Sequence, residues 1–168
     1  MRADDLRTLQ APLKERYRAD ATTAEVMLSA TGTLDEGISC SVETGAAIAA
    51  AGLHPASGGD GSLLCSGDLL LQALVACAGV TLRAVSTSLE VPVAGGTVSA
   101  EGDLDFRGTM GISKDAPVGF RSIRLRFDLN TTATDEQLDT LLRLTERYCV
   151  VLQTLASSPE LSTSLARA

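Results

Sequence analysis

The sequence predicts an α+β fold with mostly antiparallel strand pairing. Residues 66–89 form a predominantly apolar run of helical length. Residues 97–107 and 120–129 alternate apolar and polar side chains, which is typical of strands with one face exposed to solvent. A second helical pattern occupies residues 134–155. Helices and strands that follow one another in separate runs favour this fold class.

Composition narrows the functional classes. The 168-residue chain carries a formal net charge of −7, and it has no cluster of Lys and Arg, so neither nucleic acid nor an anionic membrane is an expected partner. The N-terminus lacks the apolar run of a signal peptide, which predicts a cytoplasmic protein with reduced thiols. No CxxC pair is present, so we expect no metal and no cofactor. The cysteines are Cys40, Cys65, Cys77 and Cys149.

The first third of the chain predicts an arm followed by a hairpin. Leucines at helical spacing among charged residues predict a peripheral helix over residues 3–19, so that a single domain (1–168) would carry a helical arm at about 1–20. Residues 23–31 and 37–44 alternate as two strands of a hairpin. Residues 45–53 fit either a third strand or a short helix.

A Gly-rich linker precedes the long apolar run. It contains His54, the only histidine, which is a candidate general base but has no predicted partner. Cys65 falls just before the expected helix, where the helix dipole lowers a thiol pKa, although a role in packing alone is the simpler interpretation.

The apolar run predicts the central helix of the core. Ser66 is a suitable N-cap, and Asp68 in the first turn suits the positive end of the helix dipole. Apolar residues then occupy every face for about three turns, which is typical of a buried helix and too short to span a bilayer. Cys77 lies near the middle of this helix.

Charged residues mark the exposed face of the predicted strands. Glu101, Asp103 and Asp105 alternate on one strand, and Arg124 and Arg126 on the next. An acidic trio is a candidate metal site, but cross-strand ion pairs with the two arginines account for both sets of charges.

The last helix is predicted to begin with a capping box from Thr134 to Gln137. Its apolar face includes Cys149, so two helices each present one cysteine to the interior. Buried free cysteines usually behave as small hydrophobic residues, and a redox pair is the alternative.

Two stretches resemble the OsmC/Ohr family of hydroperoxide reductases. The first is Ser66-Gly-Asp-Leu-Leu-Leu-Gln-Ala-Leu-Val-Ala-Cys77, which is similar to the family's central-helix signature ending in Ala-Cys. The second is Glu146-Arg-Tyr-Cys149-Val-Val-Leu-Gln-Thr-Leu, which is similar to the segment with the family's second cysteine. The resemblance covers residues 20–165.

This resemblance implies an OsmC-like fold, with antiparallel sheets wrapped around two central helices in an interlocked homodimer. It also implies a peroxidase of the oxidative stress response. Cys77 matches the cysteine that attacks an organic hydroperoxide and becomes a sulfenic acid, and Cys149 matches the cysteine that resolves it as a disulfide. A dithiol reductant then reopens the disulfide. Thiolate chemistry and an apolar pocket for the substrate agree with this assignment.

The chain departs from the family pattern in three places. Gly67 stands where the family has an acidic residue, and Asp68 is the nearest substitute. In a continuous helix, however, Asp68 points to the face opposite Cys77 and lies about 13 Å from it along the helix axis. Valines follow Cys149 where the family has Cys-Pro-Val, so the helix is expected to run straight through Cys149. Arg18, beside the first predicted strand, is the candidate for the family's activating arginine.

Two functions therefore compete. The first is a thiol peroxidase that uses Cys77 and Cys149. The alternative is a small-molecule binding or structural protein that keeps the fold with little or no peroxidase activity, as Gly67 and the missing Cys-Pro suggest.

Overall fold

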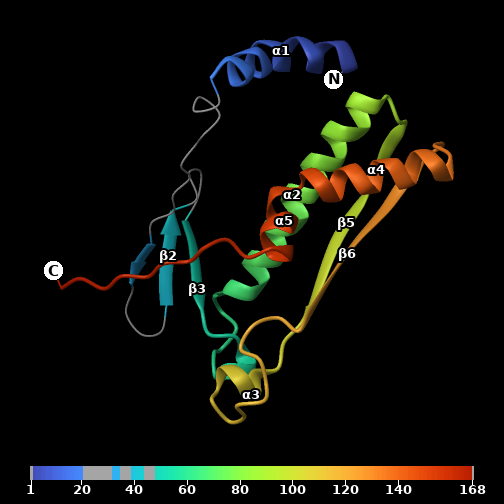
Figure 1. Ribbon diagram of the computed structural model, residues 1–168. Coiled ribbons are helices and arrows are strands. Elements are labelled where there is room, and N and C mark those ends of the chain that lie inside the picture. Colours follow the sequence, from blue (N-terminus) through green and yellow to red (C-terminus); the bar gives the residue numbers. More distant parts are fainter. Residues whose placement is uncertain (1, 21–31, 35–38, 44–47, 168) are drawn as a thin grey trace.

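The computed structural model describes residues 2–20, 32–34, 39–43 and 48–167 (Figure 1). The elements, in chain order, are α1 Ala3–Ala19, β1 Gly32–Leu34, β2 Ser39–Glu43, β3 Ile48–Gly52, the 3-10 helix η2 Pro55–Ser57, β4 Leu64–Cys65, α2 Ser66–Leu89, β5 Val93–Asp103, α3 Phe106–Thr109, β6 Ser122–Thr131, α4 Asp135–Tyr148 and α5 Val150–Ala156. This is a mixed α/β arrangement.

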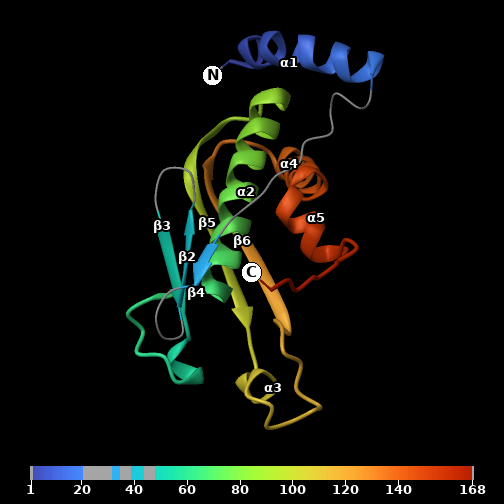
Figure 2. The ribbon, with the colours of Figure 1, turned by 90° about the vertical axis from the view of Figure 1, so that its left-hand side faces the viewer.

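The long helix α2 organises the fold, as the sequence predicts. It begins at Ser66, and its N-cap is Cys65, one residue before the predicted cap. Figure 2 shows α2 at the centre, with the β5–β6 pair along one side and α4 and α5 along another. Four buried residues at spacing four form its inner face: Leu74, Ala78, Leu82 and Ser86.

The prediction that α2 is buried all round is wrong for the isolated chain. Its outer face is exposed, and Val80 has an exposed fraction of 72%. The unbroken apolar part is about three turns long, but α2 as a whole has the length and composition that could cross a bilayer. Core helices of soluble proteins meet the same criteria, so these two properties do not assign α2 to a membrane. The exposed residues on its outer face include Ala73, Ala76, Val80 and Ala84, together with the charged Arg83.

The first sheet is four-stranded, in the order β1-β2-β3-β4. β1 and β2 are antiparallel, with Leu34 opposite Cys40. β2 lies within the predicted strand 37–44, whereas β1 follows the predicted strand 23–31, and the connecting residues 35–38 lie outside the described residues. The expected strand 23–31 lies outside them as well. Residues 45–53, ambiguous in the sequence, contain the strand β3, which pairs antiparallel with β2 and parallel with β4.

The second sheet is the antiparallel pair β5–β6, whose register places Ala100 opposite Leu125. β5 continues through the Gly95-Gly96 pair, with a register shift between Val93 and Gly95. Gly96 has φ 146°, and a Cβ there would lie 2.3 Å from the Asp128 carbonyl oxygen, so only glycine fits. β5 ends at Asp103, four residues before the predicted end, because Asp105 caps the short helix α3.

The charged face of this sheet is explained by ion pairs. Arg124 pairs across the strands with Asp103 and Glu101, as predicted. Arg126 instead pairs with Asp128 on its own strand. In the described part of the chain, no group of three or more His, Cys, Asp or Glu side chains is placed to hold a metal ion.

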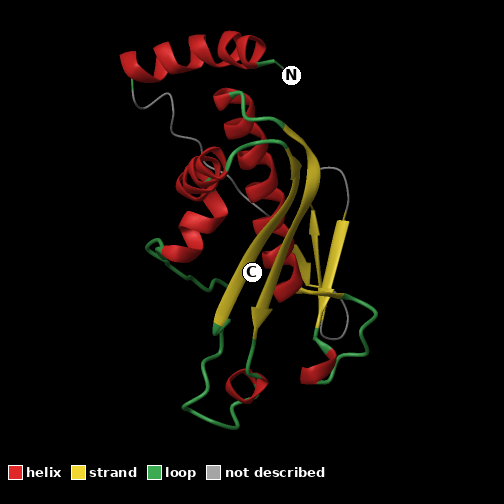
Figure 3. Cartoon of the chain, turned by 90° about the vertical axis from the view of Figure 1, so that its right-hand side faces the viewer, coloured by secondary structure: helices red, strands yellow, loops and turns green. Residues whose placement is uncertain are grey.

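The last helical segment departs from the prediction at one position. α4 begins with the predicted capping box between Thr134 and Gln137. The helix does not run straight through Cys149, however. Cys149 has φ −73° and ψ 106°, an extended conformation that ends α4, and α5 starts at the next residue. Figure 3 shows α4 and α5 as two helices at an angle beside α2.

The arm helix α1 has the predicted boundaries and lies across the C-terminal end of α2 (Figure 1). An exposed ion pair joins Arg7 to Glu90 at 3.5 Å. Surface pairs of this kind contribute at most about 1 kcal/mol, so this ion pair alone adds little to the attachment of α1.

Candidate functional site

The two predicted cysteines meet in the core. Cys149 has an exposed fraction of 0% and forms a buried cluster with Leu74 and Ala78. Cys77 is half-buried on α2 and packs against the same cluster. Both are free thiols. The fold therefore brings together two cysteines that are 72 positions apart in the sequence (149 − 77).

The helix break at Cys149 supplies the polar environment of this site. The first N–H groups of a helix have no carbonyl partner within that helix. At the start of α5 these belong to Val150, Val151 and Leu152, and none of them donates to a backbone carbonyl in the described part of the chain. Instead, they act on the two sulfur atoms.

The pKa of Cys77 lies below its ordinary value. Burial alone raises it, because the thiolate is less well solvated than in water. Hydrogen bonding from the Val151 N–H, the Cys149 thiol, the Val150 N–H and the Thr81 hydroxyl outweighs that cost. Cys77 is thus the thiol that the site stabilises in its anionic, nucleophilic form.

The pKa of Cys149 shifts in the opposite direction. Burial is the main cause, and hydrogen bonding to Cys77 together with the Cys77 charge raises the pKa further. The N–H groups of Leu152 and Val151 lower it without reversing the shift. Cys149 is therefore the thiol that keeps its proton and donates toward Cys77.

Asp68 is not part of this arrangement. α2 is a continuous helix from Ser66 onward, so the chain does not bend at Gly67. A separation of nine residues turns Asp68 to the opposite side of the helix, where it is exposed. It is not among the groups that act on Cys77.

The candidate arginine lies at the end of α1. The backbone of Arg18 belongs to that helix, whereas its side chain lies outside the described residues. No charged side chain among the described residues is a cause of the Cys77 pKa shift.

The other candidate groups have structural roles. His54 caps η2, and its Nδ1 accepts a hydrogen bond from the Ala56 N–H at 3.0 Å. Its ring stacks on Phe106 with the centroids 4.9 Å apart. Cys65 is a half-buried free thiol at the start of α2. The side chain of Cys40 lies outside the described residues.

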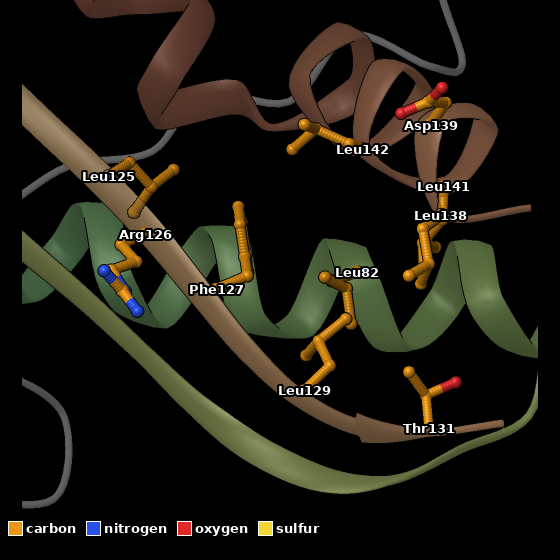
Figure 4. Close-up of a pocket in the computed structure, with 10 residues that line it drawn as sticks. All are labelled: Leu82, Leu125, Arg126, Phe127, Leu129, Thr131, Leu138, Asp139, Leu141 and Leu142. Carbon is orange, nitrogen blue, oxygen red and sulfur yellow. The ribbon is translucent and has the colours of Figure 1, made fainter. Parts of the chain in front are cut away.

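An apolar pocket lies between α2, α4 and β6 (Figure 4). Its volume is about 410 Å³. Leu125 and Phe127 line it and also pack against the cluster that contains Cys149. The remaining lining is mostly leucine, with Arg126, Thr131 and Asp139 as its polar members. A site of this size and composition suits a small apolar ligand.

Sequence reasoning missed the groups that activate Cys77. The search for a positive partner considered charged side chains, whereas the donors in this structure are backbone N–H groups and a hydroxyl. Thr81 was detectable, because a residue four positions after Cys77 lies on the same helical face. The N–H groups of Val150 and Val151 were not, because their availability depends on a break that the sequence does not mark.

The family model for OsmC-like proteins matches residues 59–164. The chain belongs to the OsmC-like protein family. The match includes both cysteines of the site and every element from β4 to α5. A comparison with curated proteins finds no significant match.

Solved structures share the OsmC-like fold at low sequence identity. An OsmC-like protein from Mycoplasma pneumoniae superposes with a TM-score of 0.68 at 15% identity, covering 80% of this chain and 90% of that one. An organic hydroperoxide resistance protein from Elizabethkingia anophelis gives 0.64 at 16% identity, covering 80% and 91%. A third, the organic hydroperoxide resistance protein OsmC from Legionella pneumophila, gives 0.61 at 15% identity, covering 79% and 93%.

Proposed function

We propose that this OsmC-like protein is a thiol peroxidase that reduces organic hydroperoxides through Cys77 and Cys149. The observation that carries the proposal is that both thiols pack in one apolar cluster and that their pKa values shift in opposite directions. One thiol is prepared to attack as a thiolate, and its neighbour keeps the proton that the second step needs. Family membership and the organic hydroperoxide resistance proteins among its structural relatives support the same activity.

The proposed reaction balances in three steps. The Cys77 thiolate attacks the peroxide, the O–O bond breaks, and the leaving alkoxide takes a proton to form the alcohol. Sulfur is oxidised by two electrons to the sulfenic acid, and the peroxide is reduced by two. Cys149 then attacks that sulfur, an S–S bond replaces the S–O bond, and water leaves. A dithiol reductant returns two electrons and restores both thiols.

The apolar surroundings indicate how the substrate would be held. The pocket between α2, α4 and β6 is lined mostly by leucine and phenylalanine, which favours the hydrocarbon part of an organic hydroperoxide over hydrogen peroxide. Neither cysteine lines this pocket, so the O–O group would have to extend past Leu125 and Phe127 toward Cys77.

We also propose that the protein acts as an interlocked homodimer in the cytoplasm. The outer face of α2 supports the dimer, because it is apolar yet exposed in the single chain. Val80→Glu would place a charge on this face, and we expect a shift to monomer in size-exclusion chromatography coupled to light scattering. In such a dimer, Arg18 of one subunit remains the candidate for the arginine that activates Cys77, either in its own subunit or in the other.

Stopped-flow consumption of cumene hydroperoxide by the reduced protein tests the proposed activity. We expect one equivalent of peroxide to be consumed per protomer without added reductant, with formation of a Cys77–Cys149 disulfide seen by mass spectrometry. With a dithiol present, consumption continues. Absence of consumption that depends on Cys77 would exclude the peroxidase.

A binding function is the second candidate, and the pocket of about 410 Å³ favours it. On this account the protein holds a small apolar molecule and the thiols are part of the core. Cys77→Ser would then leave ligand affinity and thermal stability nearly unchanged, and the wild-type protein would not consume peroxide. The two measurements separate the candidates.

A further inference from the structure

The break between α4 and α5 leaves the N–H groups of Val150, Val151 and Leu152 without helical acceptors, and a side chain caps one of the carbonyls that this frees. In a continuous helix, the Val150 N–H would donate to the carbonyl of Glu146, four residues earlier. Here the side-chain amide of Gln153 donates from Nε2 to the Glu146 carbonyl oxygen at 2.8 Å. Glu146 belongs to α4 and Gln153 to α5, so this hydrogen bond spans the break.

The sequence around the break contains no residue that enforces it. A proline after Cys149 would remove the Val150 N–H and disfavour a helical conformation at Cys149, but this chain has Val150 and Val151 instead. A neighbouring interaction must therefore make the extended conformation of Cys149 favourable. The amide of Gln153 is placed to do so, because it donates to a carbonyl that the break leaves without a backbone donor.

We propose that Gln153 is a positioning residue for the paired thiols: by capping the Glu146 carbonyl, it stabilises the break that directs the Val150 and Val151 N–H groups toward Cys77. This inference rests on the proposed function, since it assigns the cap a purpose in activating Cys77. In a continuous helix, the same two N–H groups would be bonded to the carbonyls of Glu146 and Arg147, and the sulfur would lose both donors.

The matched control is Thr154, the next residue of α5. Both side chains are exposed, and the Thr154 hydroxyl also donates to a backbone carbonyl, that of Val150 at 2.8 Å. Thr154 and Val150 both lie within α5, so their hydrogen bond does not span the break. Thr154→Val thus removes a comparable hydrogen bond from the same helix without affecting the cap.

The test is the pH dependence of Cys77 alkylation by iodoacetamide, read by peptide mass spectrometry so that each cysteine is followed separately. Among the described groups that act on Cys77, the only titratable one is Cys149, which keeps its proton, and none is charged. In Gln153→Met, which keeps the length but loses the donor, we expect a higher pKa of Cys77. Alkylation at pH 7 should slow by about fivefold, the effect of one hydrogen bond. Thr154→Val should titrate like the wild-type protein.

A rescue variant separates the break from the side chain itself. Val150→Pro combined with Gln153→Met restores the break through the proline, which is favourable at the first position of a helix. It should recover most of the lost reactivity, short of the contribution of the Val150 N–H. An unchanged pKa of Cys77 in Gln153→Met, or a double variant that reacts no faster than Gln153→Met, would overturn the proposal. Because alkylation uses no peroxide, absence of peroxidase activity in the wild-type protein would be a separate result.

Discussion

Cys77 and Cys149 share one apolar cluster, but they differ in the backbone that carries them. Cys77 lies within the continuous helix α2, whose own N–H groups are bonded along the helix. Cys149 lies at a break, where the first N–H groups of α5 have no helical partner. The N–H groups of Val150 and Val151 help to hold the pKa of Cys77 below its ordinary value, whereas burial holds the pKa of Cys149 above it.

This difference shows that burial alone does not decide thiol reactivity. Burial is the largest single influence on both sulfur atoms, and in both it raises the pKa. The two thiols diverge because the hydrogen bonds from the start of α5 and from Thr81 together favour a charge on Cys77. The nucleophile is thus carried by one helix and activated largely by another.

The largest expected effect comes from removing either sulfur. Cys77→Ser should abolish peroxide consumption, because no thiolate remains at the activated position. Cys149→Ser should consume one equivalent and then stop, with a Cys77 sulfenic acid that dimedone labels. Stopped-flow and mass spectrometry follow both variants. Equal behaviour of the two serine variants would contradict the division of roles.

Leu74→Ala tests the burial that the two thiols share. Leu74 has an exposed fraction of 0% in the cluster with Cys149, so its truncation should lower the free energy of unfolding by about 2–5 kcal/mol. Water that enters the cavity should lower the pKa of both thiols, and the pKa of Cys77 should stay below that of Cys149. Leu142→Ala, with 43% of the side chain exposed, is the control and should cost about 1 kcal/mol in urea unfolding.

Thr81→Val removes a hydroxyl that acts on Cys77 alone. It is the smallest of the causes that lower the pKa of Cys77, so we expect a small rise and alkylation slowed by less than about fivefold. Thr81→Ser keeps the hydroxyl and should react like the wild-type protein. A large loss in both variants would mean that packing, and not the hydroxyl, matters at this position.

Asp68→Asn should have the smallest effect. The side chain is exposed on the far side of α2, so we expect the Cys77 pKa to stay the same and the stability to change by no more than about 0.5 kcal/mol. Thermal unfolding and alkylation at pH 7 measure both quantities. A rise in the Cys77 pKa would show that Asp68 reaches the site in the assembled protein.

Much of the fold was predictable because local patterns dominate it. The capping box from Thr134 to Gln137 and the alternation of β6 are determined by neighbouring residues, and the structure contains both. The start of α2 was predicted to within one residue. Such features depend on few distant contacts, so sequence periodicity is sufficient to find them.

The site was only partly predictable, because it depends on a departure from local preference. The two cysteines were identified through the family resemblance, and the structure brings them together. The break at Cys149 was missed, since no Gly or Pro marks it and the stabilising amide of Gln153 acts from the next helix. The exposure of α2 was missed because an apolar pattern does not show which faces of a helix the rest of the chain covers.

The central claim is that Cys77, and not Cys149, is the thiolate of the pair. The most direct measurement follows alkylation of both cysteines in the same reduced sample across pH by peptide mass spectrometry. The account predicts that Cys77 becomes reactive at a pH below the ordinary pKa of a thiol, and that Cys149 follows only at higher pH. Alkylation of Cys149 first, or of both cysteines together, would contradict it.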